Sequence, residues 1–233
     1  MKKIKVYCLP YAGGSRSIFN DWVDEYKNIA EIVPLEYSGH GSRYGEELYT
    51  SADKMADDIY KCIVSQRPEN YIIYGHSMGS LISLLTAIRL EKNYLHAPKA
   101  VIIGGTRPPH LSYKEECIAN LPKDEFMQKI FDLEQTDPDI MNEPEFVDLF
   151  YDIIHADVVL GENYTGFSKL PQIKTNLYVM TGLQDDEAPV EDMEEWKNYC
   201  SGLFELKTFD SGHFFPFKYE GFHEYFAELI RSV

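Results

Sequence analysis

The sequence predicts an α/β fold with a mostly parallel central sheet, helices on both faces of that sheet and a helical lid insertion. Short apolar runs alternate with longer amphipathic segments along most of the 233 residues, which is typical of parallel strands joined by crossover helices. The interval 108–166 interrupts this alternation with several prolines and no convincing strand. We therefore expect a single domain over residues 1–233, with the lid insertion at about 108–166.

Each expected strand is a short apolar run, and each expected helix repeats apolar residues at three- and four-residue steps. The strands are Ile4–Leu9, Glu31–Glu36, Tyr71–Tyr74, Ala100–Ile103, Leu177–Met180 and Leu203–Phe209. The helices are Ser17–Ile29, Ala52–Gln66, Leu81–Lys92 and Tyr219–Ser232, with Lys123–Leu133 and Glu143–Ile154 inside the insertion. The order of these elements is that of crossover units in a parallel sheet.

The composition excludes several classes of protein. The formal net charge of −16 argues against binding to nucleic acid, because phosphate contacts need clustered Lys and Arg. No stretch approaches the roughly 18 apolar residues of a membrane span, and the N-terminus lacks the apolar core of a secretory signal. The four cysteines are scattered without a Cys-x-x-Cys pair, so we expect free thiols. These features predict a cytoplasmic protein without a membrane partner.

The strongest chemical signal is Gly75-His76-Ser77-Met78-Gly79, which lies between an expected strand and an expected helix. A serine on such a turn is held in a strained conformation with its hydroxyl exposed at the carboxyl end of the sheet. Glycines flank it because side chains there would collide with the neighbouring strand and helix. In this context the motif predicts the nucleophile elbow of an α/β-hydrolase fold, with Ser77 as the nucleophile.

A serine hydroxyl needs a base to take its proton, and His213 is the histidine in the expected place. In this fold the chain order is serine, acid and histidine, with the histidine after the last strand. His213 follows Leu203–Phe209 and precedes the closing helix. By contrast, His76 lies inside the elbow, where we expect it to pack, and His223 lies within the closing helix, where we expect a surface residue.

The acid that orients the imidazole should follow a strand between the serine and the histidine. Asp185 and Asp186 both follow Leu177–Met180, so both are candidates. Asp185 is favoured because it stands three residues after Gly182. The other aspartate would then be a solvated loop charge.

The tetrahedral intermediate of such a reaction needs two donors for its oxyanion. One is the backbone N–H of Met78, directly after the nucleophile. The second should come from the glycine-containing loop after the first strand, where Ala12 is our choice and Tyr11 the alternative. The sequence shows no zinc motif, no phosphate-binding loop and no Gly-x-Gly-x-x-Gly after a strand, so we expect no metal and no cofactor.

Several segments add a family resemblance. They are Pro10-Tyr11-Ala12-Gly13-Gly14-Ser15, Ser38-Gly39-His40-Gly41-Ser42-Arg43, the elbow, the acid loop from Gly182 to Trp196, and Gly212-His213-Phe214. Together they resemble the type II (editing) thioesterases that accompany nonribosomal peptide and polyketide synthases. Ser38 departs from the proline usual in that family. The family places its acid three residues after the glycine and eleven before the tryptophan, and Asp185 satisfies both spacings. Arg107-Pro108-Pro109-His110 also resembles the family's chain leading into the lid.

The resemblance implies a stand-alone, monomeric enzyme that hydrolyses acyl or aminoacyl thioesters on the phosphopantetheine arm of acyl or peptidyl carrier domains. Ser77 would form an acyl-enzyme, the thiol would leave, and water activated by His213 would release the acid. The lid would shape the acyl pocket. Because a chain at −16 should repel acidic carriers at long range, docking would need an apolar contact or a local basic patch, for which Lys114, Lys123 and Lys129 are candidates.

Other functions fit parts of the same pattern. A carboxylesterase, a lipase or a free acyl-CoA thioesterase would use the same triad on another substrate. A chain-releasing thioesterase domain would act within a synthase, although the strand directly after Met1 favours a separate protein. A binding protein on a hydrolase scaffold would not need Ser77, Asp185 and His213 together.

Overall fold

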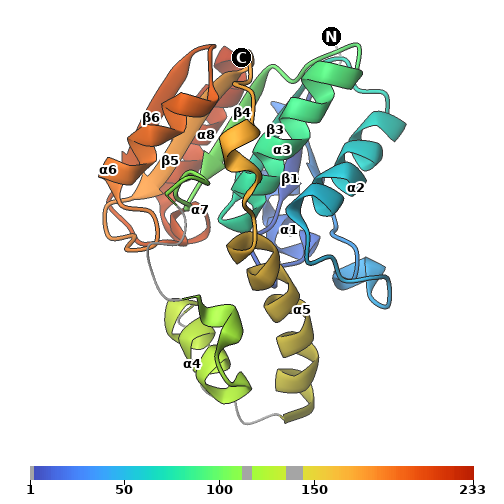
Figure 1. The fold of residues 1–233 in the computed structure, drawn as a ribbon. Coiled ribbons are helices and arrows are strands. Elements are labelled where there is room, and N and C mark those ends of the chain that lie inside the picture. The colour runs from blue at the N-terminus through green and yellow to red at the C-terminus, as the bar shows by residue number, and fades with distance from the viewer. Residues whose placement is uncertain (1–2, 112–116, 135–143) are drawn as a thin grey trace.

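The computed structural model describes residues 3–111, 117–134 and 144–233. Its centre is a six-stranded sheet in the order β2-β1-β3-β4-β5-β6, and every pair of neighbouring strands is parallel (Figure 1). The strands are β1 (Ile4–Leu9), β2 (Ala30–Pro34), β3 (Tyr71–His76), β4 (Ala100–Gly104), β5 (Asn176–Gly182) and β6 (Phe204–Phe209). The predicted parallel α/β sheet is confirmed, and each expected strand occurs within a few residues of its predicted bounds.

The central strands are apolar throughout because helices cover both faces of the sheet. In β1, for example, Tyr7 and Leu9 pack into the core on one face, whereas Val6 and Cys8 pack into the core on the other. The first core lies under α2 (Ala52–Ser65), α3 (Met78–Asn93), α6 (Val190–Met193) and η6 (Glu194–Tyr199). The second lies under η1 (Arg16–Phe19), α1 (Asn20–Glu25), α7 (Phe215–Lys218) and α8 (Glu220–Ser232).

Two helices differ from the prediction at their ends. The predicted helix Ser17–Ile29 is instead a 3-10 turn followed by α1, which ends at Glu25. It ends there because the Tyr26 carbonyl accepts from the amides of Ile29 and Ala30, which turns the chain into β2. The helix after the elbow begins at Met78, earlier than predicted, because Ser77 itself is its N-cap residue.

The functional end of the sheet follows from the strand order. The chain leaves β1 toward β2 on one side and returns to β3 on the other, so the order reverses between β1 and β3. In open α/β sheets, ligands bind at such a point, outside the carboxyl ends of the strands. Leu9 and Gly75 are register partners there, which brings the loop after β1 next to the elbow after β3.

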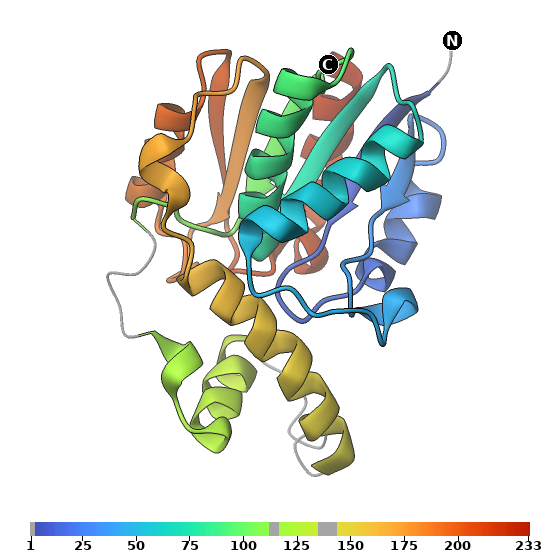
Figure 2. The same cartoon turned by 45° about the vertical axis from the view of Figure 1, so that its right-hand side comes forward.

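The insertion between β4 and β5 is helical in its described part. It contains η3 (Ile118–Asn120), α4 (Lys123–Glu134), α5 (Pro144–Glu162) and η5 (Gly166–Lys169). Figure 2 shows α4 and α5 projecting beyond the carboxyl end of the sheet, with the C-terminal end of α5 next to α3. The two helices predicted here occur, and α5 runs on to Glu162. The predicted helix start at Glu143 and the carrier-docking candidate Lys114 lie outside the described residues.

Within these described ranges, no helix combines the length and the apolar character needed to cross a membrane. The four cysteines are unpaired, as expected: Cys8 and Cys200 are buried, Cys62 is partly buried and Cys117 is exposed.

Candidate active site

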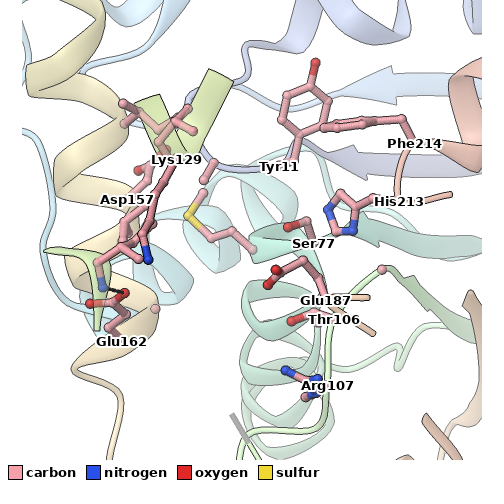
Figure 3. A pocket seen from close by; sticks show the side chains of 18 of the residues that line it. Tyr11, Ser77, Thr106, Arg107, Lys129, Asp157, Glu162, Glu187, His213 and Phe214 are labelled. Atoms are coloured by element: carbon pink, nitrogen blue, oxygen red, sulfur yellow. Dashed lines mark hydrogen bonds between the residues drawn. The ribbon is translucent and has the colours of Figure 1, made fainter. Parts of the chain in front are cut away.

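A cavity of about 720 Å³ opens at the carboxyl end of the sheet (Figure 3). The loop after β1 contributes Tyr11 and Ala12, and the elbow contributes Ser77 and Met78. His213 lines the same cavity from the loop after β6. Its other walls come from the segment after β4, from Glu187 and Phe214, and from the insertion, including residues of η3, α4 and α5. The cavity therefore gathers residues from both ends of the chain around Ser77.

Ser77 has the strained backbone that the elbow motif predicts. Its φ of +53° and ψ of −121° lie in a region that side-chain-bearing residues rarely adopt. Its N–H donates to the Gly104 carbonyl at 2.7 Å, which ties the turn to β4. Met78 begins α3 directly afterwards, so its N–H is one of the leading helix amides that have no partner within a helix.

The flanking glycines let the elbow fit between its neighbours. A Cβ on Gly75 would lie 2.1 Å from the Gly79 carbonyl oxygen, and a Cβ on Gly79 would lie 2.5 Å from the Leu9 carbonyl oxygen. Both atoms are backbone, so neither contact could relax by a side-chain rotation. The motif spacing is thus a requirement of close packing between β1, β3 and α3.

His213 and Asp185 face each other directly. The His213 Nδ1 lies 3.1 Å and 3.0 Å from the two carboxylate oxygens of Asp185, whose side chain is fully buried. Asp185 Oδ1 also accepts from the Glu187 N–H at 3.0 Å, which fixes the carboxylate. Asp186 is exposed, and its backbone carbonyl accepts from Arg107. Of the two candidate acids, Asp185 is the one that the structure brings to His213.

The acid loop and the histidine loop can approach this closely only because residue 182 is glycine. A Cβ there would lie 2.1 Å from the Ser211 carbonyl oxygen and 2.5 Å from that of Gly212. Trp196, which follows the acid loop in the chain, is buried, and its indole N–H donates to the Thr106 carbonyl after β4 at 2.8 Å. The glycine of the sequence pattern therefore lets the acid loop approach the histidine loop, and the tryptophan ties the segment after the acid loop to the chain after β4.

We expect Gly182→Ala to destabilise the protein by about 1–3 kcal/mol and to lower kcat, because the new methyl group would push the acid loop away from His213. Gly212→Ala is the matched control, since its nearest contact would be the Gln184 carbonyl at an ordinary 3.7 Å. Thermal unfolding and ester hydrolysis measure both effects. Equal melting temperatures and equal kcat values for the two variants would contradict this reading of Gly182.

The loop after β1 offers few amides to a substrate. The Gly13 N–H donates to Asp157 Oδ2 at 2.8 Å, and the Gly14 N–H donates to the Tyr11 carbonyl at 3.0 Å. Both amides are therefore used within the protein. Tyr11 and Ala12 are the residues of this loop that line the cavity, so they remain the candidates for the expected second donor.

The other histidines near the site have different environments. His76 is fully buried, its ring lies 5.1 Å from that of His213, and burial lowers its pKa well below the usual value. It therefore packs as a neutral ring, as expected. The expectation of a surface residue at His223 is wrong: this side chain is only 24% exposed and its Nδ1 lies 2.6 Å from the Tyr26 hydroxyl. His223 thus joins α8 to α1.

Charged side chains from the insertion also reach the cavity. Lys129 lines it from α4, and Asp157 and Glu162 line it from α5. Lys123, another candidate for carrier docking, is paired with Asp148. Over the described ranges, no group of three or more His, Cys, Asp or Glu side chains is placed to hold a metal ion.

Sequence reasoning missed a buried pair beside the loop after β1. His40 and Asp157 are 2% and 1% exposed, and the His40 Nε2 lies 2.9 Å from Asp157 Oδ2. The two residues are 117 positions apart, so no local motif joins them. A signal was present in Gly39-His40-Gly41, which follows the second strand within a segment that also carries the family resemblance.

Comparison with known proteins assigns the family. The model of the thioesterase domain family matches residues 4–232, nearly the whole chain. The thioesterase PikA5 of Streptomyces venezuelae is 27% identical over 215 residues, covering 91% of this chain and 75% of that protein. LgrE of Brevibacillus parabrevis, named a linear gramicidin dehydrogenase, is 26% identical over 216 residues, covering 91% and 82%.

The fold comparison agrees with the sequence comparison. The crystal structure of ClbQ, from the colibactin NRPS/PKS pathway, matches with a TM-score of 0.91 at 26% identity, covering 99% of this chain and 98% of that one. The family predicted from the sequence segments is confirmed by the match over residues 4–232. The chain therefore belongs to the thioesterase family and has the α/β-hydrolase fold.

Proposed function

We propose that this thioesterase acts through a triad of Ser77, His213 and Asp185. The observation that carries the proposal is the contact of the His213 Nδ1 with both carboxylate oxygens of Asp185. Carboxylate oxygens can only accept, so Nδ1 carries a proton and Nε2 is left as the proton acceptor. Figure 3 shows the Ser77 side chain beside this ring, at the wall of the cavity that both residues line.

In the first step, Ser77 Oγ attacks the thioester carbonyl while its proton passes to the His213 Nε2. The tetrahedral intermediate collapses, the thiol leaves with that proton, and an acyl-enzyme remains. Water then repeats the sequence: His213 takes its proton, and the carboxylic acid leaves as the proton returns to Ser77. Asp185 stays ionised and stabilises the imidazolium that forms twice per turnover.

The oxyanion of each intermediate is bound by the N–H of Met78 and, in our proposal, by the N–H of Ala12. The amides of Gly13 and Gly14 are already used, which favours the residue before them. The insertion then acts as the lid over a single domain, because η3, α4 and α5 all contribute walls to the cavity. Acyl groups would lie between this lid and Ser77.

Replacing Ala12 by proline removes that N–H, and we expect kcat to fall about a hundredfold to a thousandfold, equivalent to roughly 3 kcal/mol of barrier. Ala12→Gly is the matched control, because glycine keeps the N–H while losing the methyl group. Steady-state hydrolysis of a p-nitrophenyl ester measures the difference. A proline variant as active as the glycine variant would assign the second donor to Tyr11 instead.

We propose that the substrates are short acyl and aminoacyl groups in thioester linkage to the phosphopantetheine arm of carrier domains, and that the reaction clears stalled or misprimed synthases. The names of the relatives support this: ClbQ belongs to a colibactin NRPS/PKS pathway, and two proteins named as probable anguibactin and cadicidin biosynthesis thioesterases are also similar to this chain. Lys129 on α4 places a positive charge at the cavity, which would attract an acidic carrier domain or the phosphate of its phosphopantetheine arm.

The test is a panel of carrier domains loaded with short acyl, aminoacyl and long acyl groups. Free acyl-CoA thioesters and p-nitrophenyl esters with the same acyl groups are assayed alongside, with Ser77→Ala as the background. A clearly higher kcat/KM on carrier-bound short acyl and aminoacyl groups supports the editing function. If free acyl-CoA or the esters are preferred by about tenfold or more, equivalent to at least 1.4 kcal/mol, the enzyme is a general thioesterase or carboxylesterase with the same triad.

A further inference from the structure

A buried ion pair joins three separate parts of the chain beside the active site. Asp157 Oδ2, on α5, accepts from the His40 ring at 2.9 Å and from the Gly13 N–H at 2.8 Å. His40 lies in the segment after β2, and Gly13 lies in the loop after β1. Figure 3 shows Asp157 on the α5 side of the cavity, across from Ser77 and His213. One carboxylate oxygen therefore links the insertion to the loop that supplies the proposed oxyanion donor.

The surroundings of His40 require both ring nitrogens to carry protons. Nε2 faces the Asp157 carboxylate, and Nδ1 lies 3.0 Å from the Ser38 carbonyl. Carboxylate and carbonyl oxygens only accept hydrogen bonds, so each ring nitrogen must donate one. Burial alone would lower the pKa of His40, but the hydrogen bond and charge of Asp157, the Ser38 carbonyl and the charge of Glu36 raise it. Tyr37 packs edge-on against the ring and is kept neutral, because burial raises its own pKa.

The same segment holds the loop at further points. Glu36 accepts from the Arg16 N–H and from the Ser42 N–H, each at 3.0 Å. The Tyr37 hydroxyl donates to the Pro10 carbonyl at 3.0 Å. These contacts fix both ends of the loop from within the sheet domain. The middle of the loop, at the peptide between residues 12 and 13, is held by Asp157 from the insertion.

We propose that Asp157 and His40 are positioning residues that aim the Ala12 N–H at the oxyanion and make that aim depend on α5 being docked. This inference rests on the proposed hydrolase mechanism. Asp157 holds the 12–13 peptide, and rotation of that peptide would also turn the adjoining 11–12 peptide, which carries the Ala12 N–H. Because this N–H binds the oxyanion, loss of the charged pair would weaken binding of the transition state more than binding of the substrate. Asp157 and His40 touch neither the nucleophile nor its base, and they act through the loop.

The pair also predicts a pH dependence. The folded pKa of His40 is raised, so the charged pair is complete below the ordinary histidine pKa of about 6.5 and is lost as pH rises through the folded value. Neutral His40 has one proton for two acceptors, and Asp157 then loses a charge-assisted hydrogen bond. In the wild-type enzyme, kcat should therefore fall on the alkaline side as His40 loses its proton.

The test compares full-length wild-type, His40→Gln and Asp157→Asn enzymes on a p-nitrophenyl ester between about pH 5 and 9, which covers the usual titration range of histidine and extends above it for a raised pKa. We expect both variants to lose about tenfold to a hundredfold in kcat at neutral pH, with KM changed less than about threefold. The reason is that the weakened interaction, between the Ala12 N–H and the oxyanion, is made in the transition state. His40→Gln keeps an N–H donor toward Asp157 but cannot titrate, so its kcat should lack the alkaline fall. Asp157→Asn removes the charge that holds the His40 proton, so its alkaline fall should move to lower pH.

Asp152→Asn is the control, because it removes one carboxylate from the exposed side of the same helix. Thermal unfolding of all four proteins distinguishes a loss of folding stability from a misoriented Ala12 N–H. If both pair variants keep the wild-type kcat and pH profile, the inference is wrong even though the triad stands. If a fluorophosphonate fails to label Ser77 in the wild type, the proposed mechanism itself is wrong. The ester substrate keeps both outcomes independent of the carrier assignment.

Discussion

Ser77→Ala should lower kcat by about a hundred-thousandfold or more, because the substitution removes the nucleophile and leaves only the oxyanion donors and substrate binding. The strained backbone at φ +53° is what places this hydroxyl at the cavity, so no neighbouring side chain is expected to take its place. Hydrolysis of a p-nitrophenyl ester and labelling by a fluorophosphonate probe measure the loss. Both signals should disappear together.

Ser83→Ala is the matched control. Ser83 is a buried serine on α3, the helix that follows the elbow, and its hydroxyl has no hydrogen-bond partner among the described residues. Removing that hydroxyl takes away a buried polar group without breaking a contact, so activity and labelling should persist. Residual labelling of Ser77→Ala, or equal loss in both variants, would contradict the assignment of Ser77.

The strain at the elbow also has a thermodynamic consequence. A side-chain-bearing residue in a sparsely populated region costs of order 1–3 kcal/mol, and alanine at position 77 keeps that cost. Glycine adopts positive φ readily, although it loses more backbone entropy on folding, by about 0.5–1 kcal/mol. We therefore expect Ser77→Gly to be inactive but more stable than Ser77→Ala, as measured by the free energy of unfolding in denaturant. A less stable glycine variant would contradict strain at this residue.

The sequence was sufficient for features that local patterns determine. The strands were predictable because burial on both faces makes them continuous apolar runs, and the elbow because its glycines stand where a Cβ would strike backbone. The spacing from Gly182 to the acid favoured Asp185, and the structure brings that residue to His213. Each of these signals lies within a few residues of the group it identifies.

Features that depend on packing between distant segments were not predictable. His40 stood in the sequence only as part of a family-resemblance segment, and nothing within that segment points to Asp157 on α5. His223 lies within the closing helix, where we expected a surface residue, but the hydroxyl of Tyr26, directly after α1, contacts its ring. The early end of α1 at Glu25 similarly depends on turn bonds that lead into β2. Contacts of this kind are determined by how the helices pack on the sheet.

Asp185→Asn should lower kcat by about a thousandfold to ten-thousandfold, through the tautomer of His213 rather than through its position. In the wild type, Asp185 Oδ1 accepts from the Glu187 N–H, and an asparagine oxygen can keep that bond. The asparagine NH₂ group then occupies the site of Oδ2 and donates toward the His213 Nδ1. A protonated Nδ1 would then face a second donor at 3.0 Å, which disfavours that tautomer although the retained oxygen also lies 3.1 Å away. The proton therefore moves to Nε2, which can no longer take the proton of Ser77.

Asp186→Asn changes a neighbouring aspartate by the same chemistry, but its side chain is exposed and only its backbone carbonyl, which the substitution leaves in place, contacts Arg107. We expect its kcat to stay within about twofold of the wild type, as for most surface substitutions. Steady-state kinetics of the two variants on one ester, with thermal unfolding as a check on folding, separates the adjacent acids. A large loss in Asp186→Asn with little loss in Asp185→Asn would reverse the assignment. Equal small losses would mean that the imidazole keeps its working tautomer without a carboxylate, and Asp185 would then hold the loop in place without orienting the base.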